Sequence, residues 1–143
     1  NGALPMNEVT EQTLDDMLDR AYKAMARAYV PYSHFQVGAC LLTGSGQYYA
    51  GCNIENAAFT PTNCAERTAV FQAVYEGERR FDALAVVCSG ENIAFPCGVC
   101  RQVLAEFCEP DMPVICANRD RSRVVRSTFS ELLPHAFGPK NLL

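Results

Sequence analysis

The sequence predicts an α/β protein in which helices cover both faces of a mixed five-stranded sheet, a three-layer α-β-α sandwich. Helical and strand-like hydrophobic patterns alternate along the 143 residues in the order α-β-β-α-β-α-β-β-α. One apolar run, Phe81–Cys88, is typical of a buried central strand. No repeat or linker divides the chain, so we expect a single domain over residues 10–143. Residues 1–9 are expected to form an N-terminal tail, disordered or an expression scar.

The first half of the pattern predicts a helix followed by a hairpin. Across residues 10–29, apolar side chains recur at helical spacing, Thr10 can cap the N-terminus and Pro31 follows the end. Residues 35–42 and 47–54 are strand-like, and the Thr-Gly-Ser-Gly sequence between them is typical of a turn. We therefore expect an amphipathic helix and two antiparallel strands.

The second half alternates helices with strands. Residues 65–76 predict a helix that ends before Gly77, and residues 97–107 predict another that begins after Pro96. The remaining elements are short: strands over residues 113–117 and 123–126, and a last helix over residues 127–133. Because strands and helices are interleaved, the helices are expected to pack on the faces of one sheet.

Composition restricts the partners and the compartment. A formal net charge of -4 disfavours binding to the phosphates of DNA or RNA, and no apolar run approaches the roughly 18 residues of a membrane span. We therefore expect neither nucleic acid nor membrane as a partner, and a small neutral substrate instead. Eight cysteines without a secretory signal predict buried or metal-binding thiols in a reducing, cytoplasmic compartment.

Three of the cysteines have the spacing of a metal site. Cys64 stands alone, and Cys97 follows 33 residues later with Cys100 three positions beyond it. Three thiolates can fill three corners of a tetrahedral zinc site and leave the fourth to water, which is typical of catalytic zinc, whereas structural zinc normally shows two close pairs. Cys52 and His34 are candidates for a fourth ligand; both are disfavoured, and a lone His entering a strand is more often structural.

Charged residues beside these cysteines complete a catalytic set. Glu66 lies two positions after Cys64; alone it would only compensate a helix dipole, but beside a zinc water it can carry protons. Arg67 and Arg101 follow the two cysteine elements and can donate hydrogen bonds to ligand sulfur or nearby backbone, which offsets the net -1 charge of Zn²⁺ with three thiolates. The alternative for either arginine is an exposed helix residue.

Further segments extend the pattern well beyond the metal site. They are Pro31-Tyr32-Ser33-His34-Phe35-Gln36-Val37-Gly38-Ala39, Gly51-Cys52-Asn53-Ile54-Glu55-Asn56, Pro96-Cys97-Gly98-Val99-Cys100-Arg101-Gln102 and Phe137-Gly138-Pro139. Together with Cys64-Ala65-Glu66, they resemble the cytidine deaminase family in its small, three-cysteine, homotetrameric type, over roughly residues 10–140. The resemblance implies a cytidine deaminase-like version of the predicted sandwich.

The resemblance also implies a substrate site. The contacts it implies are Phe35 against the pyrimidine, Asn53 and Glu55 at the ribose hydroxyls, the Ala65 amide with Glu66 at the base, and Phe59 and Phe137 reaching a neighbouring subunit's pocket in a homotetramer. For Asn53 and Glu55 the physics agrees, because alternate strand residues share a face and an amide with a carboxylate suits a diol. Phe59 stands where the family often has Tyr, so no hydroxyl is available there.

The function implied by the resemblance is zinc-dependent hydrolytic deamination of cytidine and deoxycytidine to uridine and deoxyuridine, with release of ammonia, in pyrimidine salvage. One Zn²⁺ per chain would activate water, and Glu66 would protonate N3 and then the leaving amine. Three alternatives remain: a deaminase of another aminopyrimidine nucleoside such as blasticidin S, a non-enzymatic structural zinc module, and a Cys-x-x-Cys thiol oxidoreductase, which would leave the Cys64-Ala65-Glu66 element without a role.

Overall fold

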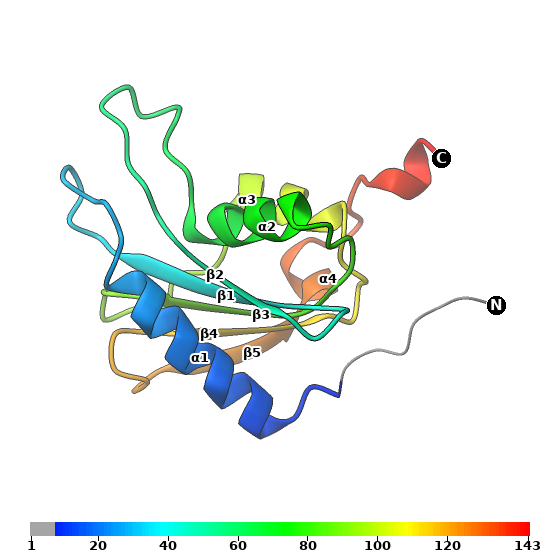
Figure 1. The fold of residues 1–143 in the computed structure, drawn as a ribbon, viewed down its shortest axis with the longest axis horizontal. Coiled ribbons are helices and arrows are strands. Elements are labelled where there is room, and N and C mark those ends of the chain that lie inside the picture. The colour runs from blue at the N-terminus through cyan, green and yellow to red at the C-terminus, as the bar shows by residue number, and fades with distance from the viewer. Residues whose placement is uncertain (1–7) are drawn as a thin grey trace.

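The computed structural model describes residues 8–143 and confirms the predicted α/β sandwich (Figure 1). Most of the predicted tail, residues 1–7, lies outside the described residues. The elements are α1 (Glu11–Met25), β1 (Val37–Thr43), β2 (Tyr48–Cys52), α2 (Ala65–Tyr75), β3 (Phe81–Cys88), α3 (Gly98–Ala105), β4 (Pro113–Ala117), β5 (Val124–Thr128), α4 (Phe129–Leu132) and a 3₁₀ turn, η1 (Pro139–Asn141). Their order is the predicted one, with the 3₁₀ turn added.

The five strands form one mixed sheet in the order β2-β1-β3-β4-β5. The predicted hairpin is present, because β1 and β2 pair antiparallel with Leu42 opposite Tyr48. β1 also pairs antiparallel with the central strand β3, and β4 pairs antiparallel with β5. Only β3 and β4 are parallel, and α3 lies between them in the chain, as a parallel connection requires. Among the described residues, no helix has the length and apolar character needed to cross a membrane.

The first helix ends earlier than its sequence pattern predicts. Thr10 caps it as expected, since its side chain accepts a hydrogen bond from the Thr13 amide. The helix stops at Met25 rather than near residue 29, because the Tyr29 amide donates to Asn53 O at 3.0 Å instead of to a helical carbonyl. This backbone pairing joins the segment after α1 to the segment after β2.

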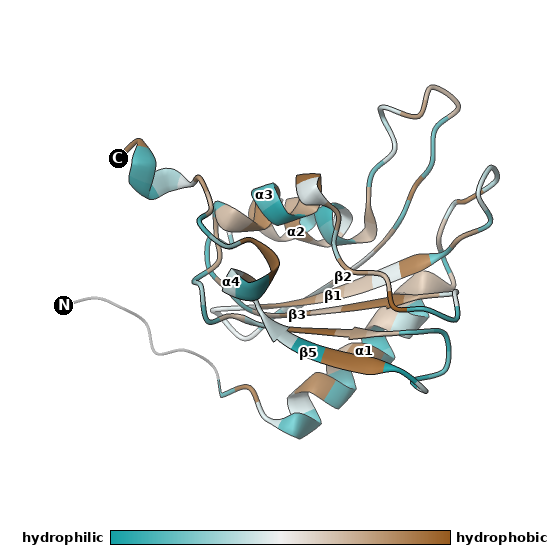
Figure 2. Cartoon of the chain, turned by 180° about the vertical axis from the view of Figure 1, so that it is seen from behind, coloured by the Kyte–Doolittle hydropathy of each residue, from teal (hydrophilic) through white to brown (hydrophobic). Residues whose placement is uncertain are grey.

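The central strand separates two hydrophobic cores. Its side chains alternate, so that Leu84 and Val86 pack with α2, α3 and α4, whereas Ala83, Ala85 and Val87 pack with α1. Seen from behind, β1 and β3 are mainly brown and the turns at their ends teal (Figure 2). The sheet is therefore buried on both faces, which explains why β3 is apolar throughout except for Asp82.

Two glycines bring the helices close to the sheet. A Cβ at Gly38 would lie 2.0 Å from Ala21 O of α1, and a Cβ at Gly51 would lie 2.5 Å from Ala65 O of α2. Contacts below 3.0 Å against backbone cannot be relieved by a side-chain rotation. Gly51 therefore allows the N-terminus of α2 to rest directly on β2, and this fixes where the residues around Cys64 lie.

Candidate active site

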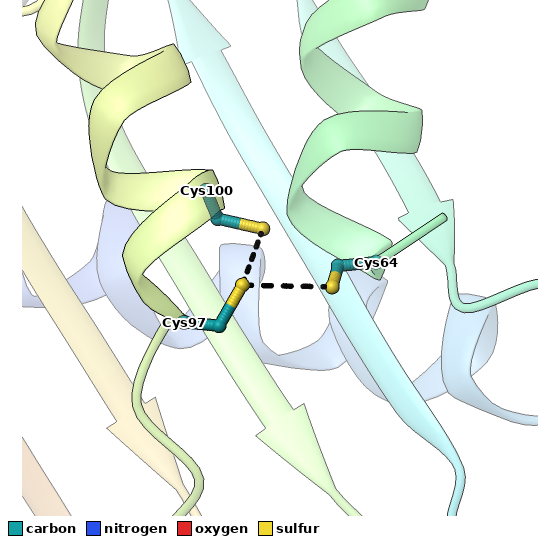
Figure 3. Close-up of side chains that lie close together, drawn as sticks. All are labelled: Cys64, Cys97 and Cys100. Atoms are coloured by element: carbon teal, nitrogen blue, oxygen red, sulfur yellow. Dashed lines mark hydrogen bonds between the residues drawn. The ribbon is translucent and has the colours of Figure 1, made fainter. Parts of the chain in front are cut away.

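Three cysteine sulfurs meet at one point of the molecule. The Sγ atom of Cys97 lies 3.8 Å from that of Cys64 and 3.6 Å from that of Cys100, and the three atoms lie within 4.8 Å of one another (Figure 3). Zn–S bonds of about 2.3 Å at tetrahedral angles place sulfurs about 3.8 Å apart. The spacing of the three thiols therefore fits a zinc ion, and among the described residues they are the one cluster with this potential.

Helix ends hold these sulfurs in place. Cys64 is the N-cap of α2 and Cys97 the N-cap of α3, and neither side chain makes a capping hydrogen bond to its own helix. Cys100 lies one turn into α3 and is fully buried. The positive ends of two helix dipoles thus face the cluster, which favours thiolates.

The thiols are electrostatically prepared for a cation. Hydrogen bonds from Cys100 and from Arg67 lower the pKa of Cys64, whereas the hydrogen bond to Cys64 and burial raise the pKa of Cys100. The Cys64 thiol therefore ionises more readily than the Cys100 thiol, which holds its proton more tightly. A cation that binds must displace this proton, so metal affinity depends on pH.

The two arginines make different contacts. Arg67 donates from Nη2 to Cys64 Sγ at 3.2 Å, which places a positive charge against the sulfur itself. Arg101 donates to two carbonyl oxygens, Pro96 O at 2.6 Å and Leu132 O at 2.6 Å. Arg101 therefore holds the backbone in front of Cys97 and ties α3 to the end of α4, while Arg67 offsets charge.

Glu66 occupies the first turn of α2 and is only 4% exposed. Burial raises its pKa from 4.5 to about 7, and the negative charge of Cys64 adds to the increase. A carboxyl group with a pKa near neutrality can both accept and release a proton at physiological pH, which an acid–base catalyst needs. Ala65, whose amide is expected to contact a base, is fully buried beside it at the start of the same helix.

A second group of predicted residues lies on the loops after α1 and β2. Asn53 Oδ1 accepts a hydrogen bond from the Val37 amide at 2.9 Å, and Asn53 Nδ2 donates to Phe35 O at 2.8 Å. The Glu55 carboxylate accepts hydrogen bonds from Tyr32 and Ser33. The two loops project side by side from one end of the sheet (Figures 1 and 2). The structure thus brings Phe35, Asn53 and Glu55 together.

The three predicted aromatic residues are all exposed. Phe35 is 39% exposed and lies close to Gly90, where a Cβ would stand 2.9 Å from its ring. Phe59 is 73% exposed, has φ 61° and stacks edge-on against Tyr32. Phe137 is 58% exposed on the C-terminal segment, which projects from the other end of the molecule (Figure 1) and is tied to α3 through Gln102. Within one chain, Phe137 does not join Phe35 and Phe59.

Comparison with known proteins identifies the family of this chain. The family model for the cytidine and deoxycytidylate deaminase zinc-binding region matches residues 11–116. A cytidine deaminase of Sporosarcina psychrophila is 50% identical over 129 residues, which cover 90% of this chain and 94% of that protein. The chain belongs to the cytidine deaminase family. Another cytidine deaminase, from Halalkalibacterium halodurans, is 48% identical over 126 residues, covering 88% of this chain and 95% of that protein.

Solved structures of cytidine deaminases have the same fold. The crystal structure of the cytidine deaminase from Burkholderia pseudomallei matches with a TM-score of 0.81 and 42% identity, covering 86% of this chain and 98% of that one. The crystal structure of the cytidine deaminase from Mycobacterium tuberculosis matches with a TM-score of 0.73 and 38% identity, covering 87% of this chain and 96% of that one. As a member of the family with a zinc-binding region, this chain has one zinc ion as its cofactor, and its three clustered thiols fit that ion.

Two residues that contact the expected site residues Glu55 and Phe35 were missed by sequence reasoning. Ser33 contacts both Glu55 and the Phe35 amide, and Gly90 packs against the Phe35 ring. Ser33 lies inside one of the segments that carry the resemblance, so its position was a signal for a role. Gly90 lies about 55 positions from Phe35 along the chain, and only the fold brings the two together.

Proposed function

We propose that this protein catalyses the zinc-dependent hydrolytic deamination of cytidine and deoxycytidine to uridine and deoxyuridine with release of ammonia, a step of pyrimidine salvage. One observation carries the proposal: three thiols at tetrahedral spacing, with no fourth ligating side chain from the described residues in the cluster, lie beside the buried carboxyl of Glu66. Three ligands rather than four leave a position for chemistry. Cys52, a candidate fourth ligand, instead donates to Arg27 O at 3.5 Å.

In this proposal the metal ligands are Cys64, Cys97 and Cys100, and the proton carrier is Glu66. When bound, zinc supplies a Lewis acid that makes water nucleophilic near neutral pH. Glu66 takes a proton from the attacking water, delivers it to N3 of the cytosine as C4 is attacked, and then moves a proton to the departing amine. Burial of Glu66 excludes bulk water from these transfers, and its pKa of about 7 matches both directions of transfer.

The rest of the chain would bind and orient the nucleoside. Asn53 and Glu55 would take the ribose hydroxyls, Phe35 would pack on the pyrimidine and the Ala65 amide would contact the base. The side chains of Asn53 and Glu55 bond to Tyr32, Ser33, Phe35 and Val37, none of which carries a positive charge. We therefore expect an unphosphorylated 5′ end, since a phosphate there would meet no cationic partner.

We further propose that the enzyme is a cytoplasmic homotetramer in which neighbouring chains complete each pocket. Large apolar side chains are exposed on α2, on α3 and on the segments after β2 and α4: Phe59, Phe71, Tyr75, Val99 and Phe137. Burying such residues favours association, and exposed apolar patches usually mark interaction sites. Phe137, which projects away from its own site, would then serve a neighbour's. Sedimentation analysis at micromolar concentration tests this assembly, and a monomer would contradict it.

The decay of the ultraviolet absorbance of cytidine tests the activity directly. The protein should turn over cytidine and deoxycytidine, lose activity when a chelator removes zinc, and regain it when stoichiometric zinc is restored. A panel with dCMP and blasticidin S tests the substrate. Comparable turnover of dCMP and deoxycytidine would contradict the expected preference, and turnover of blasticidin S alone would identify the alternative deaminase. Metal content near zero in active protein would refute the zinc chemistry.

A further inference from the structure

We infer that Ser33 is a positioning residue of the sugar site, whose hydroxyl holds Glu55 and the Phe35 backbone in the arrangement that receives the nucleoside. This inference rests on the proposed function, because it assigns Glu55 to a sugar hydroxyl. It concerns a residue that contacts no reacting atom and acts only through its neighbours. The observations that carry it are the hydrogen bonds of a single hydroxyl group.

The Ser33 hydroxyl bridges two groups of the sugar site. Its Oγ donates to Glu55 Oε2 at 2.5 Å and accepts from the Phe35 amide at 3.0 Å. The Ser33 amide also donates to Glu55 Oε1, at 3.1 Å, together with the Tyr32 amide at 3.0 Å. A hydroxyl that donates to a carboxylate while accepting from an amide fixes both partners at once.

Counting lone pairs shows what remains of Glu55 for a ligand. An ionised carboxylate accepts about four hydrogen bonds, two at each oxygen. Oε1 already accepts two, from the amides of Tyr32 and Ser33, and Oε2 accepts one from the Ser33 hydroxyl. One position, on Oε2, is left for a sugar hydroxyl, and the Ser33 hydroxyl on the same oxygen determines where it points.

The same network reaches Asn53. Phe35, whose amide is held by Ser33, uses its carbonyl oxygen to accept a hydrogen bond from Asn53 Nδ2, and Asn53 Oδ1 accepts from Val37. Glu55, Ser33, Phe35 and Asn53 therefore form one chain of contacts across two loops. The two loops that carry these residues project from the same end of the sheet (Figure 1).

The loop that carries Ser33 needs such contacts. The residues from Pro31 to Phe35 are exposed, so little packing holds them. His34 has φ 58°, in the left-handed region that side-chain-bearing residues disfavour, and such backbone persists only where its surroundings impose it. The hydroxyl of Ser33, immediately before His34, makes two of the hydrogen bonds that hold this part of the loop.

The test compares Ser33→Ala with a matched control on two substrates. Ser45 also donates its hydroxyl to a glutamate, Glu78, on the exposed hairpin away from the site, so Ser45→Ala removes an equivalent Ser–Glu contact. Ser33→Thr keeps the hydroxyl. Steady-state constants are measured for cytidine and for 2′,3′-dideoxycytidine, which offers no 2′- or 3′-hydroxyl to Glu55. Zinc content and thermal unfolding are measured for each variant.

For cytidine, Ser33→Ala should raise KM by about tenfold, the effect of one hydrogen bond to a charged group, with kcat changed by less than about threefold. For 2′,3′-dideoxycytidine, Ser33→Ala should lower kcat/KM clearly less than it does for cytidine, because the sugar hydroxyl that would donate to Glu55 is absent and only the support of the Phe35 backbone is lost. Ser33→Thr should restore the cytidine KM, and Ser45→Ala should match wild type with one zinc per chain throughout.

A readout without turnover follows the carboxyl of Glu55. Its pKa is lowered first by the side-chain hydrogen bond from Ser33, so ¹³C NMR should show this pKa rising in Ser33→Ala and unchanged in Ser45→Ala. The inference is overturned if the cytidine KM of Ser33→Ala equals that of wild type, if both substrates lose equally, or if Glu55 titrates unchanged. Wild type that does not deaminate cytidine would instead refute the proposed function, and the inference with it.

Discussion

Replacing Glu66 with Gln separates two consequences of burying this carboxyl group: its capacity to carry protons and its effect on the stability of the fold. The side chain is 4% exposed, and Gln has nearly the same shape without the ability to ionise. As a proton carrier, Glu66 should contribute about 10²- to 10⁴-fold in rate, so Glu66→Gln should lose that factor in kcat/KM for cytidine. Because the expected zinc ligands are the three clustered thiols and not Glu66, zinc content should remain one per chain.

Glu66→Gln should lower the activity, but it should raise the stability of the metal-free protein. Burial raises the pKa of Glu66 from 4.5 to about 7, so the neutral carboxyl stabilises the folded state fully below pH 4.5, and this stabilisation is lost as pH rises through about 7. Each tenfold change in an ionisation constant is worth about 1.4 kcal/mol, which gives about 3 kcal/mol for this group. Gln cannot ionise and avoids this loss.

Urea unfolding of chelator-treated protein at pH 5 and pH 8 measures the difference. Glu66→Gln and wild type should be similar near pH 5, and the variant should be more stable by up to about 3 kcal/mol at pH 8. Glu76→Gln, the same substitution at an exposed position ending the same helix, should change neither stability nor activity. Full activity in Glu66→Gln, or a variant less stable than wild type at pH 8, would refute the reasoning.

Three further perturbations test the metal centre and the base site. Arg67→Ala removes the donor at 3.2 Å from Cys64 Sγ and should weaken zinc affinity by about 10- to 100-fold in chelator competition, and unchanged affinity would show that the contact carries no weight. Gly90→Ala puts a Cβ 2.9 Å from the Phe35 ring, so the ring must move. The cytidine KM should then rise roughly tenfold with zinc retained. An unchanged KM would show that Phe35 does not contact the substrate. In zinc-free protein at pH 6, iodoacetamide should label Cys64, whose pKa is lowered by hydrogen bonds from Cys100 and Arg67, but not Cys40, whose pKa burial raises to about 12. Equal labelling of Cys64 and Cys40 in mass spectra would contradict this order of reactivity. Labelling of Cys64 that added zinc does not reduce would contradict the zinc site.

Hydrophobic pattern and turn residues were enough to predict the elements of the fold. β3 and β4 begin and end where the sequence predicts, because Phe81–Cys88 and Pro113–Ala117 are apolar runs between charged or loop residues. The predicted end of the first helix was wrong by about four residues, because the backbone of Tyr29 pairs with the segment after β2. No local pattern contains that long-range hydrogen bond.

The sequence predicted more of the metal centre than of the loop contacts around the proposed sugar site. Cys64, Cys97 and Cys100 stand at helix N-termini, and a helix start can be recognised from the chain alone. The contacts of Glu55 depend on a loop that begins more than twenty residues earlier, so residue type predicted a polar function but not the partners. Only a structure shows that most acceptor positions of this carboxylate are already occupied.

In the proposed site, two helices hold the catalytic groups and two exposed loops hold the groups that would bind the nucleoside, and this division has a kinetic consequence. The three thiols and Glu66 are set by α2 and α3, and Gly51 allows α2 to sit directly against the sheet. Phe35, Asn53 and Glu55 are set by hydrogen bonds between two exposed loops. Substitutions beneath α2 should therefore lower kcat and zinc affinity together, since the proposed ligand Cys64 and the proposed proton carrier Glu66 lie at the start of the same helix. Substitutions in the loops should act mainly on KM while the metal stays bound. Gly51→Ala, whose Cβ would lie 2.5 Å from Ala65 O, tests the first half of this statement, and a Gly51→Ala variant that changed only KM would contradict it.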